Sequence, residues 1–288
     1  MKLIIFYQIQ HFFLLKLRVV MYQLSILVLL YNCGLEESKT LSSLFNVSFN
    51  LSNVKLVVWN NGPEKIKYKN ISNGKNIEIE FIQTVHNESL SKIYNSFIDN
   101  NASVKYLILD HDSTVDQQYI NSVMSSEIHN ISIPEIICGG VIRAPFVNGK
   151  VYNKNMIFNN SDFIVSIGSG LVIGNDVIRE MKNEYGRVFD ERFFLYGVDT
   201  SFFKRLNKCL KKNAFEICVL PPINHSLSKL ETEDEDISRF RIIERSYDMG
   251  LNLRYYTSTC KVPMHLMKYL FTDVMSCILN KKRYYSFL

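Results

Sequence analysis

The sequence predicts an α/β protein with a mostly parallel, doubly wound sheet and helices on both of its faces. Two observations indicate this class. Continuous apolar runs of strand length recur through the first part of the chain, and segments with helical spacing of apolar residues alternate with them. Strands buried on both faces read as such continuous runs, and strand-helix alternation is typical of a parallel sheet. With 47% hydrophobic residues among 288, the chain also has enough apolar material for a large core.

The first half of the chain supplies the clearest elements. Residues 25–31 (SILVLLY) predict a strand that ends at a turn, and residues 36–49 carry the helical spacing of the next element. Residues 54–59 (VKLVVW) predict a second buried strand. The remaining elements expected here are a strand over residues 77–84, a helix over 89–98 and a strand over 106–109.

The pattern is weaker beyond residue 115. The acidic run at residues 231–236 (ETEDED) is interpreted as a solvated loop, because clustered like charges repel one another and stay in water. An apolar helical segment is expected over residues 264–279, followed by a basic end at residues 281–283. The other predicted elements are strands over residues 133–138 and 163–167 and helices over 176–184 and 200–212.

Composition and the chain ends exclude several classes of protein. A net charge of +5 is too small for a typical nucleic-acid binder, so no nucleic-acid partner is expected. The six cysteines lack the spacing of a zinc site, which is typical of reduced thiols in a cytoplasmic protein. Residues 1–20 are apolar but interrupted by polar and charged side chains, so neither a spanning helix nor a secretory signal is predicted. We expect an N-terminal extension, or a start site set too far upstream, over residues 1–20, a main domain over 21–260 and a basic amphipathic helix over 261–288.

Asp110 and Asp112 are the first candidate functional residues. They follow a predicted buried strand at its carboxyl end, where open α/β sheets bind their ligands. Two carboxylates one residue apart on an extended chain point to the same side. Such a pair suits a divalent cation, Mg²⁺ or Mn²⁺, because these ions combine one or two carboxylates with phosphate oxygens. Taken alone, the D-x-D pattern equally fits turn-forming aspartates after a strand.

A wider pattern carries a family resemblance. In order along the chain stand a strand ending at Tyr31, a strand ending at Asn60, a segment beginning at Asn87, and the strand that leads to Asp110 and Asp112. This order resembles the nucleotide-sugar-binding half of family-2 glycosyltransferases of the GT-A fold. That family would imply a GT-A type sheet and a nucleotide-sugar donor.

The second half of the resemblance is more specific. Residues 189–199 (FDERFFLYGVD), with Arg205 beyond them, look like the family's acceptor-side motif, and Ser169-Gly170 is similar to its small-residue turn. The resemblance covers residues 22–230 and is nearest to bacterial rhamnosyl- and hexosyltransferases that build O-antigen or capsule. It implies that Tyr31, Asn32, Asn60, Asn87, Asp110 and Asp112 bind the nucleotide sugar, that Asp112 and His225 hold the metal, that Asp199 is the general base, and that Ser169, Gly170 and Arg205 lie on the acceptor side.

Three positions depart from the family pattern. Asn60, Ser89 and Val198 stand where the family usually has Asp, Gly and Glu. The first departure changes the contact expected with the nucleobase. The last leaves Asp199 as the only carboxylate expected at its site.

Several candidate residues also have structural interpretations. Asp199 opens the helix predicted over residues 200–212, so its carboxylate fits an N-cap as well as a base. Arg205 fits an ion pair that braces the loop before it, and His225 fits an ordinary core or surface histidine. His111, between the two aspartates, is expected to face the other way and pack.

The function expected from these features is inverting transfer of a hexose or deoxyhexose from a nucleotide sugar to a hydroxyl of a surface-polysaccharide acceptor, expected to be lipid-linked. One alternative is a non-catalytic sugar- or nucleotide-binding or scaffold subunit of a polysaccharide assembly complex. Another is a sugar nucleotidyltransferase, although no Gly-rich phosphate loop with a lysine stands near the N-terminus. The apolar segment 264–279 and its basic end favour peripheral attachment to the inner face of the cytoplasmic membrane, and a helix that packs on the domain is the alternative.

Overall fold

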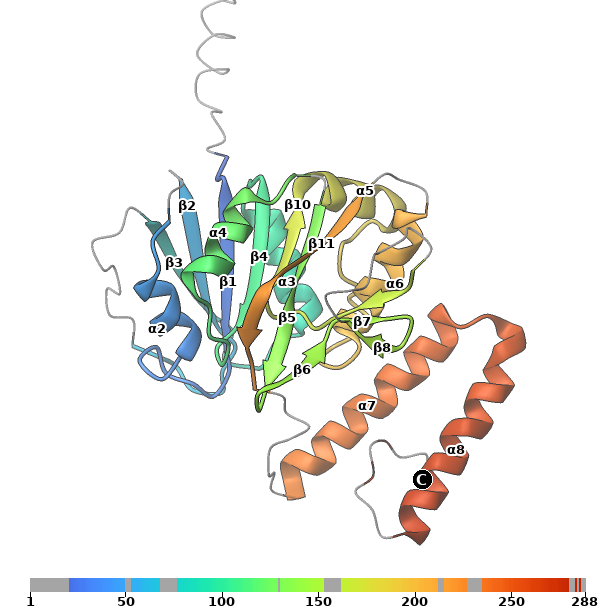
Figure 1. Ribbon diagram of the computed structural model, residues 1–288. Helices are drawn as coiled ribbons and strands as arrows, with labels where there is room; N and C mark the ends of the chain where they lie inside the picture. The colour runs from blue at the N-terminus through green and yellow to red at the C-terminus, as the bar shows by residue number, and fades with distance from the viewer. Residues whose placement is uncertain are drawn as a thin grey trace, which may run out of the picture.

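The computed structural model describes residues 21–49, 53–67, 77–128, 130–152, 162–211, 215–226, 235–279, 283 and 285. Within these residues the main sheet has eight strands in the order β11-β5-β10-β4-β1-β2-β3, with β6 paired to β5. Helices cover both faces of this sheet, and two long C-terminal helices extend beyond it (Figure 1). The predicted α/β class with a mostly parallel sheet is confirmed.

The parallel half of the sheet matches the continuous apolar runs. Strands β1 and β4 pair in parallel, as do β1 with β2 and β2 with β3. All seven residues of β1 are buried, which is the burial that its uninterrupted apolar sequence predicts. The carboxyl ends of these strands therefore lie along one edge of the sheet. The strands are β1 (Leu24–Leu30), β2 (Val54–Asn60), β3 (Ile77–Gln83) and β4 (Lys105–Asp110).

The other half of the sheet is mixed and was less predictable. β10 (Leu171–Gly174) runs antiparallel between β4 and β5 (Asn130–Cys138), and β11 (Glu216–Asn224) pairs in parallel with β5. The sequence analysis missed β10, which has four residues, and β11, whose two prolines lie in a register shift. Of the strand predicted over residues 163–167, two residues form β9 (Ile164–Val165). β9 belongs to a small second sheet with β7 (Phe146–Val147) and β8 (Lys150–Val151), and β6 (Val141–Ala144) borders β5.

Two apolar cores lie on opposite faces of the sheet. Alternate residues of β1 face opposite ways, so that Leu27 joins one core while Ile26 and Val28 join the other. Helix α4, which the sequence analysis missed, contributes Tyr119 to the second core. The first core is covered by α3 (Leu90–Asn100), α5 (Asn175–Tyr185) and α6 (Val198–Leu210), and the second by α2 (Lys39–Asn46) and α4 (Gln117–Ser125).

The C-terminal part forms a helical pair outside the sheet. Helix α7 (Glu235–Tyr256) is followed by a short 3₁₀ turn (Thr259–Lys261) and by α8 (Val262–Ile278) (Figure 1). The loop expected over residues 231–236 is therefore wrong at its end, since α7 begins at Glu235. Residues 231–234 lie outside the described residues.

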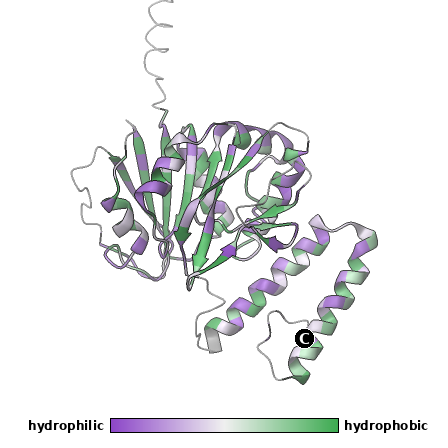
Figure 2. Cartoon of the chain, viewed as in Figure 1, coloured by the Kyte–Doolittle hydropathy of each residue, from purple (hydrophilic) through white to green (hydrophobic). Residues whose placement is uncertain are grey.

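Helix α8 agrees with the expected apolar helix but exposes much of its apolar surface. Met267 and Phe271 are about 70% exposed, and Figure 2 shows hydrophobic residues interspersed with hydrophilic ones along the helix. Asp273 is the one buried side chain of α8 and pairs with Arg283, with Nε–Oδ1 at 2.7 Å. Lys281 and Lys282 lie outside the described residues, as do residues 1–20. Among the helices that the structure describes, none combines the length and the hydropathy needed to cross a bilayer.

Candidate functional site

Asp110, Asp112 and His225 form a cluster at the edge of the sheet where the parallel strands end. We call this cluster of three residues the carboxylate edge. Asp110 ends β4, Asp112 follows it by two residues, and His225 follows the last residue of β11. One ligand atom from each of the three lies within 4.8 Å of the others. His225 Nδ1 is 3.1 Å from Asp112 Oδ1, and its Nε2 is 4.0 Å from Asp110 Oδ2. Two carboxylates and an imidazole at these separations suit a divalent cation.

Backbone pairing explains why residues so far apart in sequence meet here. The segment after β4 and the end of β11 are joined by two hydrogen bonds between Thr114 and Asn224, and the amide of His225 donates to the carbonyl of Ile137. His225 is thus held in place by the end of β5 and by the turn that carries Asp112. Its Nδ1 faces Asp112, and its Nε2 faces Asp110.

The charges of the carboxylate edge shift one another's pKa. Burial raises the pKa of Asp110, and the charge of Asp112 raises it further, against the opposing effect of His225. For Asp112, burial acts upward, but the hydrogen bond from His225 and the charges of His225 and His111 leave its pKa below the ordinary value. The pKa of His225 is raised, because its contacts with Asp112 and the charges of Asp110, Asp112 and Asp199 outweigh burial. A site with this surplus of negative charge attracts cations.

Hydroxyl groups hold the turn that carries the two aspartates. The amide of Asp110 donates to Ser169 Oγ at 3.0 Å, and Ser169 Oγ lies 2.6 Å from Ser113 Oγ, which in turn lies 3.0 Å from His225 Nδ1. Thr40 Oγ1 accepts from the amide of Ser113 at 3.0 Å. Ser169, expected on the acceptor side, therefore also supports the carboxylate edge. Nothing in the spacing of the sequence pointed to Thr40 or Ser113.

Gly170 has a backbone role next to Ser169. Its φ is +83°, and a Cβ atom there would lie 2.4 Å from Cγ of Pro134. Only glycine fits both the left-handed conformation and the close approach of β5. The small-residue turn thus brings β10 against β5 while presenting the Ser169 hydroxyl to Asp110.

Asp199 lies in the first turn of α6 and is not its N-cap. The N-cap is Gly197, with φ 81°, and α6 begins at Val198, two residues before the predicted start. The N-cap interpretation of Asp199 is therefore wrong. Instead its carboxylate accepts a hydrogen bond from the amide of Gly168, while burial and the charge of Asp110 raise its pKa to about 7. A carboxyl group with a pKa near neutrality is suited to proton transfer.

The predicted nucleotide-binding residues gather at the ends of β1 and β2 and in the loop after β3. The ring of Tyr31 is 45% exposed at this edge. Asn32 and Asn87 have positive φ angles of 47° and 55°, a conformation that asparagine tolerates better than most residues. The structure therefore brings Tyr31, Asn32, Asn60 and Asn87 to the same edge of the sheet as Asp110.

The side chain of Asn60 is engaged in holding its own loop. Its Nδ2 donates to the carbonyl of Glu64 at 2.8 Å and to Gln83, and its Oδ1 accepts from the amide of Gly62 at 2.9 Å. Asn61, which the sequence analysis did not select, links the same loop to the amide and carbonyl of Glu88. Asparagine suits both positions of this loop, because each side-chain amide supplies a hydrogen-bond donor and an acceptor.

Arg205 is part of a buried ionic network, which matches its bracing interpretation. Its guanidinium lies 3.1 Å from Asp190 Oδ2 and donates to the hydroxyl of Tyr256 at 2.9 Å. Asp190 also accepts from Arg192 at 2.6 Å and from Tyr256 at 2.6 Å. We call Asp190, Arg192, Arg205 and Tyr256 the Asp190 network. It connects the loop of residues 189–197 and α6 to the end of α7.

His111, between the two aspartates, is half-buried. Its carbonyl accepts from Ser38 Oγ at 3.1 Å and from the amide of Thr40. The backbone of His111 therefore helps to fix the turn between the two aspartates.

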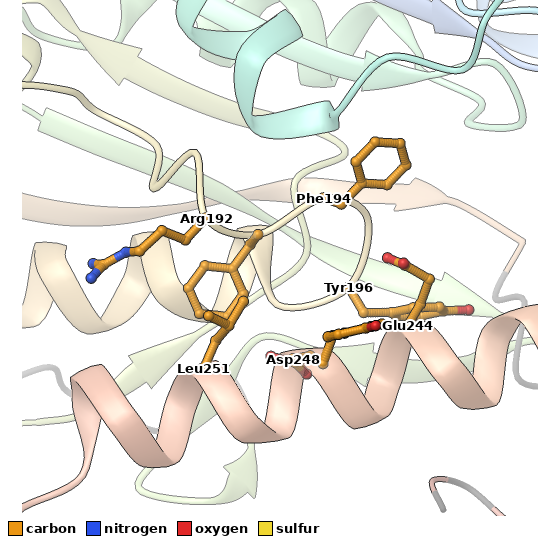
Figure 3. Close-up of a pocket in the computed structure, with 8 residues that line it drawn as sticks. Arg192, Phe194, Tyr196, Glu244, Asp248 and Leu251 are labelled. Atoms are coloured by element: carbon orange, nitrogen blue, oxygen red, sulfur yellow. The ribbon is translucent and has the colours of Figure 1, made fainter.

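A pocket of about 320 Å³ lies between the 189–197 loop and α7. Figure 3 shows Glu244 and Asp248 projecting from α7 beside Tyr196 of the loop. This pocket, which we call the α7 pocket, was not predicted, because α7 itself was missed. Its lining residues are Arg192, Phe193, Phe194, Tyr196, Glu244, Tyr247, Asp248 and Leu251.

Comparisons with known proteins give likenesses of fold. No protein-family model matches the chain, and no curated protein does. Among solved structures, S. aureus TarS is 15% identical over 86% of this chain and 43% of that one, with a TM-score of 0.47. A TarS chain of residues 1–349 in complex with UDP is 14% identical over 83% of this chain and 68% of that one, with a TM-score of 0.47. GalNAc-T7 with UDP, GalNAc and Mn²⁺ is 10% identical over 82% and 51%, with a TM-score of 0.49.

This chain thus spans less than half of the longer TarS chain and about half of the GalNAc-T7 chain.

Proposed function

We propose that the protein is an inverting glycosyltransferase of the GT-A type, which transfers a hexose or deoxyhexose from a nucleotide sugar to a hydroxyl group of a glycan. The observation that carries this proposal is the pairing of the carboxylate edge with a carboxyl group of raised pKa, Asp199, whose charge interacts with Asp110. The carboxylate edge suits a diphosphate with its cation, and Asp199 suits deprotonation of a hydroxyl. Together they are what displacement of a nucleoside diphosphate by an alcohol requires.

The residues that would hold the cation are Asp112, His225 and Asp110. Their atoms fit Mg²⁺ or Mn²⁺, because these ions prefer carboxylate oxygens and tolerate an imidazole. The cation would supply positive charge to the diphosphate oxygens as they leave. Asp110 lies at the end of the strand next to β1, so it also borders the nucleotide-binding positions at Tyr31 and Asn32.

Asp199 would act as the general base. It takes the proton of the acceptor hydroxyl as the bond from that oxygen to the anomeric carbon forms and the bond to the diphosphate oxygen breaks. Attack opposite the leaving group inverts the anomeric configuration. The amide of Gly168, which donates to the Asp199 carboxylate, fixes its orientation.

The donor half of this proposal can be tested without knowing the acceptor. Purified protein is incubated with a panel of nucleotide sugars and Mg²⁺ or Mn²⁺, and the slow release of products is followed. Release of free sugar and nucleoside diphosphate supports a glycosyltransferase. In a parallel incubation with sugar phosphates and nucleoside triphosphates, release of pyrophosphate would instead indicate a nucleotidyltransferase. No binding and no turnover with any donor would favour a non-catalytic subunit.

We also propose that the acceptor is lipid-linked and that the protein binds the inner face of the cytoplasmic membrane through α8. The exposed apolar side chains of α8, with the basic residues 281–283 after it, are the features of an interfacial helix. Met267→Ser with Phe271→Ser should abolish cosedimentation with vesicles that contain phosphatidylglycerol, because both side chains are about 70% exposed. Ser122→Ala is the control, because Ser122 lies on α4 and not on α8. This variant should cosediment as the wild type does. Full cosedimentation of the double variant would contradict this part of the proposal.

A further inference from the structure

The α7 pocket is lined by carboxylates and by aromatic rings. Glu244 and Asp248 lie one turn apart on α7 and so share one face of the helix. Around them stand aromatic rings, of which Phe194 is 39% and Tyr247 is 66% exposed. At about 320 Å³ the cavity is at the lower end of the range for small-molecule sites.

The carboxylates favour a ligand that donates hydrogen bonds. The amide of Leu195 donates to Glu244, and Asn252 donates to Asp248 Oδ1 at 2.5 Å. Burial nevertheless raises the pKa of both carboxyl groups, and at Asp248 the charge of Lys204 acts in the opposite direction. The one guanidinium in the lining, that of Arg192, is engaged with Asp190 and lies over the ring of Tyr255. The two carboxylates that line the pocket therefore favour a hydrogen-bond donor over a phosphate or other anion.

The pocket is connected to the proposed base. A Cβ atom at Gly197 would lie 2.1 Å from Asp248 Oδ1, so the backbone that leads into α6 passes directly against the pocket. Asp199 is two residues further on, and the charge of Asp248 contributes to its raised pKa. A ligand in the α7 pocket would thus lie against the backbone that leads into α6, two residues before Asp199.

We propose that the α7 pocket is the binding subsite for a sugar ring of the acceptor, with ring hydroxyls donating to Glu244 and Asp248 and the apolar face of the sugar against Tyr247 or Phe194. A pyranose carries both surfaces, since its hydroxyls lie around the rim and its C–H groups lie on the faces. This inference rests on the proposed transferase activity and assigns the residues that would bind a sugar ring of its acceptor. It makes α7, which lies outside the sheet, part of the substrate site.

The test uses the full chain with Mg²⁺ and nucleoside diphosphate, and methyl glycosides of glucose, galactose, rhamnose and N-acetylglucosamine as probes. Binding is measured by saturation-transfer NMR at millimolar concentrations. At least one glycoside should bind the wild-type protein, and its affinity should fall about fivefold in Glu244→Gln, the factor expected for one lost hydrogen bond. A similar fall is expected in Tyr247→Ala. Thermal unfolding of each variant verifies that it remains folded.

Phe240→Ala is the matched control, because Phe240 is an exposed aromatic residue of the same helix that does not line the pocket. It should bind the glycoside as the wild type does. The proposal is overturned if none of the four glycosides binds, or if binding persists unchanged in both Glu244→Gln and Tyr247→Ala. Because donor hydrolysis by the wild-type protein is measured separately, failure of the transferase proposal and failure of this subsite give different results.

Discussion

The two sides of the proposed active site are built in different ways. At the carboxylate edge, paired strands place each functional side chain, and the backbone hydrogen bonds of Thr114, Asn224 and His225 close the arrangement. On the side of Asp199, the 189–197 loop is held by charged side chains, above all Asp190 with Arg205. The first construction is rigid because the register of a sheet changes only in whole steps. The Asp199 side depends on α7, a helix that lies outside the sheet. Its residues can therefore change between related proteins without disturbing the donor site.

The largest effect that separates the two sides is expected from Asp199→Asn. Loss of a general base typically reduces turnover by roughly 10²- to 10⁴-fold. Nucleoside-diphosphate binding should persist, because the carboxylate edge keeps its own backbone support. Transfer is measured with whichever donor the hydrolysis panel identifies, and binding is measured by calorimetry. A variant that keeps more than about a tenth of wild-type turnover would place the base elsewhere.

The next largest effect should follow from Asp190→Ala, which removes the centre of the Asp190 network. Arg205 would be left buried without its partner, and breaking a buried ion pair in this way costs about 3–5 kcal/mol. Urea unfolding should show this loss, and limited proteolysis should cut α7 sooner. Asp176→Asn is the control, since its pair with Arg179 is largely exposed and should contribute less than about 1 kcal/mol. Equal stabilities of the two variants would contradict the proposal that the Asp190 network holds the 189–197 loop and α6 against α7.

Asp112→Asn should act on the donor side alone. The substitution keeps the shape of the side chain and removes the charge that a cation needs. Nucleoside-diphosphate affinity in Mn²⁺ should fall by at least the roughly 10-fold that disturbing an outer partner of a metal site costs. Asp116→Asn is the matched control, because Asp116 caps α4 and asparagine caps a helix equally well. Unchanged metal-dependent binding in folded Asp112→Asn would exclude the assigned role.

The last prediction concerns stability as a function of pH. The folded protein keeps a proton on Asp199 up to a pH of about 7, whereas the unfolded chain releases it near pH 3.8. The free energy of unfolding of metal-free wild-type protein should therefore lose this contribution as pH rises through that interval. Asp199→Asn lacks the titration, so its melting temperature relative to the wild type should rise between pH 5 and pH 8. A constant difference across this range would show that the pKa of Asp199 is ordinary.

The sequence predicted the parallel half of the fold better than the rest because each of its strands carries its own signal. β1 is apolar at almost every position and is buried at every position, so the local sequence alone suffices. β10 has four residues, and β11 contains two adjacent prolines, so both depend on neighbouring strands that no local pattern reveals. Helix α7 was missed because it has no strong apolar face.

The same distinction applies to the site. Asp110 and Asp112 were found because they follow a buried strand, and their place next to His225 agrees with the predicted metal site. Thr40, Ser113 and the α7 pocket were missed, because they depend on contacts between segments that are distant in the sequence. The N-cap interpretation of Asp199 was wrong because α6 starts two residues earlier than predicted, with Gly197 as its N-cap.

The late place of β10 in the chain has a consequence for biosynthesis. β1 to β4 can associate as soon as residue 110 leaves the ribosome, yet β4 receives its second neighbour only when residues 171–174 have been made. Until then, one side of β4 presents unpaired backbone amides and carbonyls, which are a template for pairing with other nascent chains. The yield of soluble protein should therefore depend on translation speed between these two points. Slower elongation there would lengthen the exposure of the edge and increase the demand for chaperones.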